Sequence, residues 1–254
     1  MWRVYTSLAA SFRLWDRIEN EIKTHRCLAH AAQHCADVLF SQLIDSLALV
    51  RIFATVRFYE LSGFERMKCI EHAAAHGADR GLTGKTNVLS LMGTRGAREQ
   101  WNDRRESRDH LGIPLVSASF TESIPMIATL MKEIGIGTDW IDIEEPHIIV
   151  HNRGRTAGMF YVDDARTAVD AKGRLVVPAQ QFVETENLKT VFGVGGAYPN
   201  GTFISIVFFT RMTLTRLDIE RFLPLVHAFK AGTMKIVSAR SFFEAAELPP
   251  VEVA

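Results

Sequence analysis

Residues 188–211, LKTVFGVGGAYPNGTFISIVFFTR, limit most strongly what this chain can fold into. They contain two runs of β-branched and aromatic residues, around Phe192 and from Phe203 to Phe209, on either side of the turn Pro199-Asn200-Gly201. This pattern predicts a β-hairpin whose second strand is central in a sheet. The rest of the chain must then cover an apolar sheet.

Apolar residues at steps of three and four residues predict helices on both sides of this hairpin. The predicted helices cover residues 16–43, 64–77, 124–135 and 215–229. Gly77 and Gly135 are the stop signals of the second and third helices. Thr215 and Asp218 have the spacing of a capping box at the start of the last helix, and Pro224 inside that helix predicts a kink.

Shorter apolar runs predict the remaining strands, over residues 47–61, 87–93, 139–150 and 159–162. On the first of them, we expect the face with Val50, Ile52 and Phe58 to be buried, rather than the face with Arg51 and Arg57. The order of elements predicts an α/β fold with a central antiparallel sheet, crossing helices on one face and the N- and C-terminal helices on the other.

No repeat or flexible linker divides the chain, so we expect one domain over residues 1–254, with a helical segment (1–45), a core (47–237) and a tail (238–254). The 29 basic and 29 acidic residues balance, which provides no field to attract nucleic acid or an anionic membrane. Three cysteines fit a reducing compartment better than a disulfide framework. Without a signal peptide or a membrane-spanning run, a cytoplasmic location is expected.

Two motifs carry a resemblance to a known family: W-N-x-R-R-x-S-x-x-H-x-x-I-P-L, which begins at Trp101, and F-G-x-G-G, which begins at Phe192. With the order of elements, they resemble the GAF domain, a sensor fold related to PAS that is found at the head of bacterial signalling proteins. The resemblance covers roughly residues 47–237 and implies small-molecule sensing with homodimerisation through the flanking helices. The chain carries no kinase, cyclase or receiver signature, so we expect a separate output protein as partner.

The polar tract over residues 94–110 is the candidate ligand site. The sequence does not identify the ligand or a cofactor, and it indicates no catalytic and no metal-binding residues. The candidate binding residues are Trp101, Asn102, Arg104, Arg105, Ser107 and His110. The arginines would clamp a carboxylate or phosphate, Trp101 would stack on the ligand, and Asn102 or His110 would hydrogen-bond to it. The alternative is a solvated loop whose arginines pair with nearby acids and whose Trp101 packs into the core.

Other functions remain open at this stage. Cys27, His30 and His34 fall on one helical stripe, which suggests metal or haem, although histidines near a dimer seam and cysteines acting as small hydrophobic residues explain them as well. Some proteins of the GAF fold are cysteine-dependent redox enzymes, but that chemistry needs an activated, accessible thiolate, and Cys69 lies among apolar neighbours. A protein-interaction module without a ligand is the third alternative.

Overall fold

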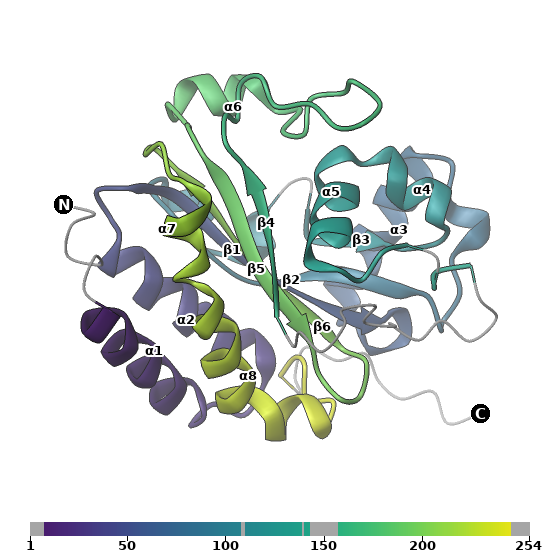
Figure 1. The fold of residues 1–254 in the computed structure, drawn as a ribbon. Helices are drawn as coiled ribbons and strands as arrows, with labels where there is room; N and C mark the ends of the chain where they lie inside the picture. Colours follow the sequence, from purple (N-terminus) through teal and green to yellow (C-terminus); the bar gives the residue numbers. More distant parts are fainter. Residues whose placement is uncertain (1–7, 108–109, 139, 143–156, 245–254) are drawn as a thin grey trace.

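The computed structural model describes residues 8–107, 110–138, 140–142 and 157–244 (Figure 1). Within them, six strands form one antiparallel sheet in the order β3-β2-β1-β6-β5-β4. The strands are β1 (Leu47–Arg57), β2 (Asn87–Gly96), β3 (Gly112–Pro114), β4 (Gly158–Val162), β5 (Val191–Ala197) and β6 (Phe203–Thr210). The longest strand, β1, lies in the middle of the sheet, between β2 and β6.

The predicted hairpin is confirmed by β5 and β6, which pair from Val191 opposite Phe209 to Ala197 opposite Phe203. In the turn, Gly201 has a φ of +81°, a conformation that glycine adopts without steric cost. Because β6 also pairs with β1, the second strand of the hairpin is central, as expected.

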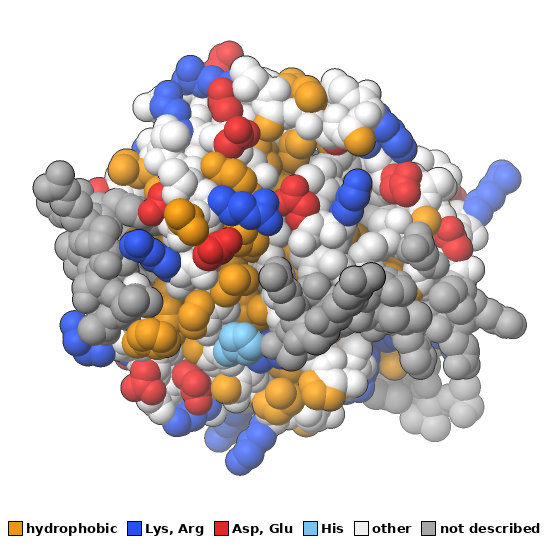
Figure 2. Space-filling view, viewed as in Figure 1, with side chains coloured by type: hydrophobic (Ala, Val, Ile, Leu, Met, Phe, Trp, Pro, Cys, Tyr) orange, Lys and Arg blue, Asp and Glu red, His pale blue; other side chains and the backbone are white. Residues whose placement is uncertain are grey.

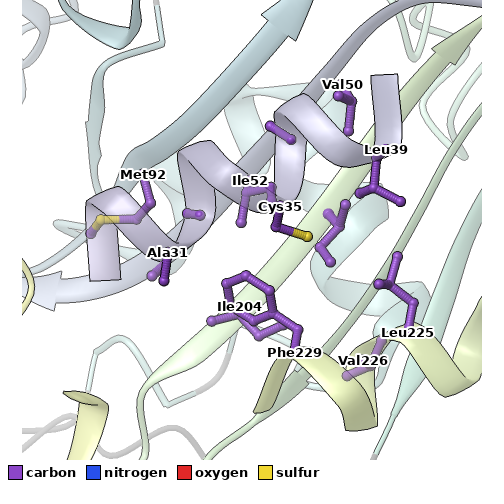
Figure 3. Packing of buried hydrophobic residues seen from close by; sticks show 14 of the residues in the cluster. Ala31, Cys35, Leu39, Val50, Ile52, Met92, Ile204, Leu225, Val226 and Phe229 are labelled. Carbon is purple, nitrogen blue, oxygen red and sulfur yellow. The ribbon is translucent and has the colours of Figure 1, made fainter. Parts of the chain in front are cut away.

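Three helices cover one side of the sheet, which we call the helical face: α1 (Leu8–Ile22), α2 (Leu28–Gln42) and α8 (Leu223–Ser238) (Figure 1). Cys35 and Leu39 of α2 and Phe229 of α8 lie in one cluster with Ile52 and Ile204 of the sheet (Figure 3). Each of these five side chains is at most 1% exposed. The core on this face is therefore closed to solvent.

Two glycines allow backbone-to-backbone approach on the helical face. A Cβ at Gly93 of β2 would lie 2.5 Å from the carbonyl carbon of Ala32 in α2. A Cβ at Gly232 of α8 would lie 2.5 Å from Cγ1 of Ile22 in α1. These distances are shorter than van der Waals contact, so α2 packs directly on the sheet and α1 directly on α8.

The opposite side of the sheet carries the short helices α4 (Ala118–Ser123), α5 (Pro125–Ile134) and α6 (Gln180–Thr185) (Figure 1). Ile127 and Ile134 of α5 and Val183 of α6 belong to one buried cluster with Phe160 and Val207 of the sheet. This face has its own core, separated from the first by the sheet.

The other helical elements lie at the edges and ends of the sheet. They are the helices α3 (Gly63–Ala75) and α7 (Arg216–Glu220) and the 3-10 turns η2 (Phe58–Glu60), η3 (Asp79–Gly81), η4 (Glu99–Trp101) and η5 (Arg104–Glu106). α3 packs beside the edge strand β3 and buries Cys69 and Ala73.

The predicted fold class is confirmed, because a central antiparallel sheet has the N- and C-terminal helices on one face and crossing helices on the other. The predicted boundaries of two helices also hold. α3 follows Ser62, whose hydroxyl accepts a hydrogen bond from the N–H of Glu65, and Gly77 beyond its end has a φ of +65°. α5 begins at Pro125 and ends at Gly135, with a φ of +90°.

Two expectations about helices are wrong. The single helix over residues 16–43 is two helices, because residues 23–27 form a turn that sends α1 along α8 and α2 across β1 and β2. The terminal helix is also divided, into α7 and α8, with the predicted capping box of Thr215 and Asp218 at the start of α7. Pro224 lies in the first turn of α8, where its missing N–H removes no helical hydrogen bond, so the chain breaks there instead of kinking.

The expected burial of β1 on one face only is also wrong. Leu49, Phe53 and Thr55 are buried on the other face, and Phe58 lies in η2, beyond the end of the strand. Most of the strand predicted over residues 139–150 lies outside the described residues, and residues 140–142 form a turn.

Candidate ligand-binding site

A cavity of about 250 Å³ lies against the sheet on the face opposite α1, α2 and α8, which we call the cavity face. Its lining from the sheet comes from the two central strands, Leu49, Arg51 and Phe53 of β1 and Phe209 of β6. These β1 residues share a face because side chains alternate along a strand. The same strand sends Val50, Ile52 and Ala54 into the core of the helical face.

The walls of the cavity come from both ends of the cavity face. One wall is the start of α5 with Ile124, Met126 and Ile127, and the other is the segment before and within α6 with Val177, Pro178, Ala179 and Phe182. Trp101 and His110 complete the lining from the polar tract. Of the described residues in this lining, only Arg51 and His110 carry ionisable side chains, so the lining is mainly apolar.

The end of β2 fixes the position of Trp101. A Cβ at Gly96 would lie 2.7 Å from Cε3 of Trp101, so the indole ring packs directly on the backbone of the strand. The Thr94 hydroxyl donates a hydrogen bond to the Trp101 carbonyl at 3.0 Å. The N–H of Gly96 donates to Oδ1 of Asn102 at 2.9 Å. The conformation of η4, and with it the ring, is therefore set by the strand.

A row of aromatic rings runs from Trp101 to the sheet. The ring centroids of Trp101 and Phe182 are 5.4 Å apart at an interplanar angle of 86°, and those of Phe182 and Phe209 are 5.6 Å apart at 69°. Edge-to-face pairs of this kind add stability beyond the area that they bury. They hold α6 against the tract that carries Trp101.

An ion-pair network ties the outer rim of the cavity together. The Arg98 guanidinium lies 5.2 Å from the centre of the Trp101 ring, and its Nε donates to Glu186 at 2.7 Å. Glu186 also accepts a hydrogen bond from Arg211 at 2.8 Å, and its side chain is only 8% exposed. Two arginines on one shielded carboxylate connect the tract to the end of α6 and to the end of β6.

Arg51 brings a permanent positive charge to the cavity. It is half-buried in the middle of β1, opposite Thr94 of β2 and Val207 of β6. No acidic residue is among the described residues that line the cavity. A guanidinium can hold a carboxylate or phosphate through parallel hydrogen bonds.

The six candidate residues fall into two groups in the structure. Trp101 and His110 line the cavity, whereas the other four are not among its lining residues. Asn102 accepts the hydrogen bond from the N–H of Gly96, Arg105 is exposed, and Ser107 is buried. The fourth residue, Arg104, is also buried. The assignment of these residues to ligand binding stays a prediction.

Arg104 has a structural environment of its own. It forms a buried ion pair with Glu65 of α3, and its guanidinium lies 5.3 Å from the centre of the Phe243 ring. Burial lowers the pKa of Arg104 to about 10. The side chain therefore connects the polar tract to α3 and to the segment that follows α8.

Arg51 is not among the predicted site residues, because the apolar pattern of the strand predicts that it faces solvent. A usable signal was present, since Arg51 stands between Leu49 and Phe53 at a spacing of two residues. An arginine flanked in this way on a central strand shares its face with buried apolar neighbours.

All three cysteines are free thiols and buried. Burial raises the pKa of Cys35 and raises that of Cys69 to about 12, and it also raises the pKa of Cys27. A thiolate is the reactive form of cysteine, and each of these environments disfavours it.

The histidines of α2 lie near a third histidine in the turn after α1. The ring centroid of His25 is 5.1 Å from that of His34 and 6.5 Å from that of His30. His34 contacts Glu21 at 2.8 Å, and His30 lies 3.5 Å from Glu244. A search of the described part of the chain finds no group of three histidine, cysteine or acidic side chains arranged to hold a metal ion.

The surface view of the molecule shows basic and acidic side chains interspersed (Figure 2), in keeping with the balanced charge of the sequence. Among the helices that the structure describes, none has the length and apolar character needed to cross a membrane.

Comparison with known proteins finds no family model and no curated protein sequence that matches the chain. The structure is similar to solved GAF domains. One is the phycoerythrobilin-bound GAF domain of a cyanobacterial phytochrome, with 10% identity, coverage of 91% of this chain and 97% of the other, and a TM-score of 0.48.

A second is the GAF domain of a phosphoenolpyruvate-protein phosphotransferase from Acinetobacter, with 12% identity, coverage of 92% and 96%, and a TM-score of 0.47. A third is the chromophore-binding domain of a bacteriophytochrome from R. palustris, with 5% identity, coverage of 90% and 62%, and a TM-score of 0.44. At identities of 5 to 12%, neither ligands nor residue roles carry over from these proteins to this chain.

Proposed function

We propose that this domain is a sensor that binds a small molecule, without catalysis, in the cavity beneath Trp101. The observation that supports the proposal most directly is the cavity itself, about 250 Å³ of space lined mainly by apolar side chains, with Arg51 and His110 as polar groups. Sites for small molecules in proteins have this composition, a concave apolar lining with a few converging polar groups that fix orientation.

The proposal keeps Trp101 and His110 as ligand contacts and gives Arg51 the role of clamping a charged group. Arg104 and Arg105 were expected to provide this clamp, but Arg104 is engaged by Glu65, and neither arginine is among the cavity residues. In the proposed site, Trp101 covers the ligand, and the sheet residues Leu49 and Phe53 support it from below.

The alternatives receive less support from the structure. A cysteine-dependent redox enzyme needs a stabilised thiolate, whereas burial raises the pKa of all three thiols. In a module that only binds other proteins, we would expect side chains to fill the space above the sheet. The cavity on this sheet supports ligand binding instead.

Signalling would use the contacts between the polar tract that carries Trp101 and the segment that follows α8, residues 241–243. Arg104, just after Trp101, contacts Phe243, and the N–H groups of Leu28 and Ala29 at the start of α2 donate to the carbonyls of Ser241 and Phe242. A ligand that moves η4 would thereby alter how the segment after α8 is held. We propose that a cytoplasmic homodimer, paired through the terminal helices, passes this change to a separate output protein.

The test is native mass spectrometry of the purified protein, compared with its denatured mass, with an absorption spectrum of the same sample. We expect a bound mass that Val177→Phe, which fills part of the cavity, removes. Ala75→Phe on the exposed side of α3 is the matched control and should leave the bound mass unchanged. A bound mass that persists in Val177→Phe would contradict the cavity as the site, and a native monomer would contradict the dimer.

A further inference from the structure

We propose that the ligand is a compact aromatic carboxylate, with one or two rings stacked beneath Trp101 and the carboxylate bound by Arg51. This inference rests on the proposed function, because it names the chemistry of the molecule in the same cavity. It follows from three properties of the site, which are size, aromatic lining and charge.

The size of the cavity limits how much of a ligand can be buried in it. A dry protein cavity of about 150 Å³ holds a benzene ring, and sites for drug-sized molecules begin at about 300 Å³. The volume of about 250 Å³ lies between these values. The cavity therefore has room for one or two fused rings with a small substituent, whereas a nucleotide or an extended multi-ring chromophore would extend beyond it.

The lining favours a flat ring over a flexible chain. Phe53, Trp101, Phe182 and Phe209 all line the cavity. Phe182 meets both Trp101 and Phe209 with its ring inclined by 86° and 69°, so ring faces and ring edges are both presented within a small space. Aromatic rings prefer offset-stacked and edge-to-face neighbours, and a planar ligand ring can adopt both here.

The charge of Arg51 favours an anionic group on the ligand. Among the described residues that line the cavity, Arg51 is the only one with a permanent charge, and His110 is the only other one with an ionisable side chain. A guanidinium has several N–H donors, so it can contact the protein and a ligand carboxylate at the same time. A phosphate dianion would carry two negative charges into a mainly apolar cavity, and its desolvation would cost more than that of a carboxylate.

The experiment measures dissociation constants by isothermal titration calorimetry for 2-naphthoate, its neutral isostere 2-naphthamide, benzoate and octanoate. A hydrogen bond to a charged group corresponds to a difference of about 10- to 100-fold in affinity. We expect 2-naphthoate to bind tighter than the amide by this factor, and tighter than octanoate. The comparison uses the unaltered protein, so it does not depend on the folding of a variant.

The matched variants are Arg51→Met and Arg57→Met, on the same strand. Arg57 donates to the carbonyl of Lys85 and is not among the cavity residues. Arg51→Met should remove the preference for the acid and leave the affinity for 2-naphthamide unchanged or higher. Arg57→Met should bind all four compounds like the unaltered protein.

Equal affinity for 2-naphthoate and 2-naphthamide would overturn the role of the carboxylate, and octanoate binding as tightly as 2-naphthoate would overturn the role of the ring. Failure of all four probes to bind would also overturn the proposed ligand class. In each of these cases the proposed function is judged separately, by whether the purified protein carries a bound mass that Val177→Phe removes.

Discussion

The two faces of the sheet differ in how completely they are filled. On the helical face, α2 lies at backbone contact with β2 at Gly93, and α8 lies close against α1 at Gly232, so neither glycine has room for a side chain. On the cavity face, short helices and loops enclose a cavity whose rim is held by the Arg98–Glu186 ion pair. One layer of this domain is therefore closely packed, whereas the other contains the unfilled space to which we assign ligand binding.

The largest test of this comparison deletes one aromatic ring from each face. Phe229→Ala, at a fully buried position of the helical face, should lower the free energy of unfolding by about 3–5 kcal/mol. Phe182→Ala, at a partly buried position on the cavity, should cost about 1 kcal/mol, because one side of this ring already borders unfilled space. Urea unfolding followed by circular dichroism measures both values, and equal losses would show that the two faces do not differ.

A smaller effect is expected from adding a methyl group between α1 and α8. Gly232→Ala would place its Cβ 2.5 Å from Cγ1 of Ile22 and 2.9 Å from the carbonyl oxygen of Glu19. Overpacking of this kind costs about 1–3 kcal/mol. Gly63→Ala, where no atom lies within 4 Å of the new Cβ, is the control and should leave stability unchanged or raise it by up to about 1 kcal/mol. If Gly232→Ala behaved like its control in thermal unfolding, the contact of α1 with α8 would be looser than described.

The smallest expected effect concerns the pH dependence of the helical face. Burial lowers the pKa of His25, and the nearby His34 and His30 lower it further. The unfolded chain therefore binds more protons than the folded protein near pH 6, so stability is complete above the ordinary histidine pKa of about 6.5 and falls as the pH drops through the lowered value.

His25→Gln should consequently lose less stability than the unaltered protein between about pH 7.5 and about pH 5.5. Exposed His227 on α8 offers the control, since His227→Gln should keep the original pH profile. The measurement is the melting temperature of each protein across this pH range. If the melting temperatures of the unaltered protein and His25→Gln fell in parallel, the role of His25 would be contradicted.

Local sequence signals sufficed for much of the fold. The hairpin around Gly201 and the ends of α3 and α5 follow from turn residues, apolar periodicity and terminal glycines, which act over a few neighbouring residues. The division of α1 from α2 did not follow, because Ile22 and Ala29 stand seven residues apart and continue the apolar stripe across the turn. Only the packing of α1 against α8, far away in the chain, requires the break.

The cavity was harder to predict than the fold. Trp101 and His110 were named because they lie in one polar tract, and both line the cavity. Arg51 and Phe182 come from distant parts of the sequence and meet only when β1 and α6 are placed on one face of the sheet. Arg104 resembles a ligand clamp in the sequence, but it pairs with Glu65, a buried acid in another helix.

The adjacency of Arg51 and Ile52 on β1 has a consequence for how this protein could evolve. Ile52 belongs to the closed core, whereas Arg51 lines the cavity, so two neighbouring residues lie in different environments on opposite faces of the sheet. If Arg51 binds the ligand as proposed, a substitution there would alter which molecules are recognised and leave the core of the helical face intact. Selection could therefore diversify recognition along this strand without first having to restore a damaged fold.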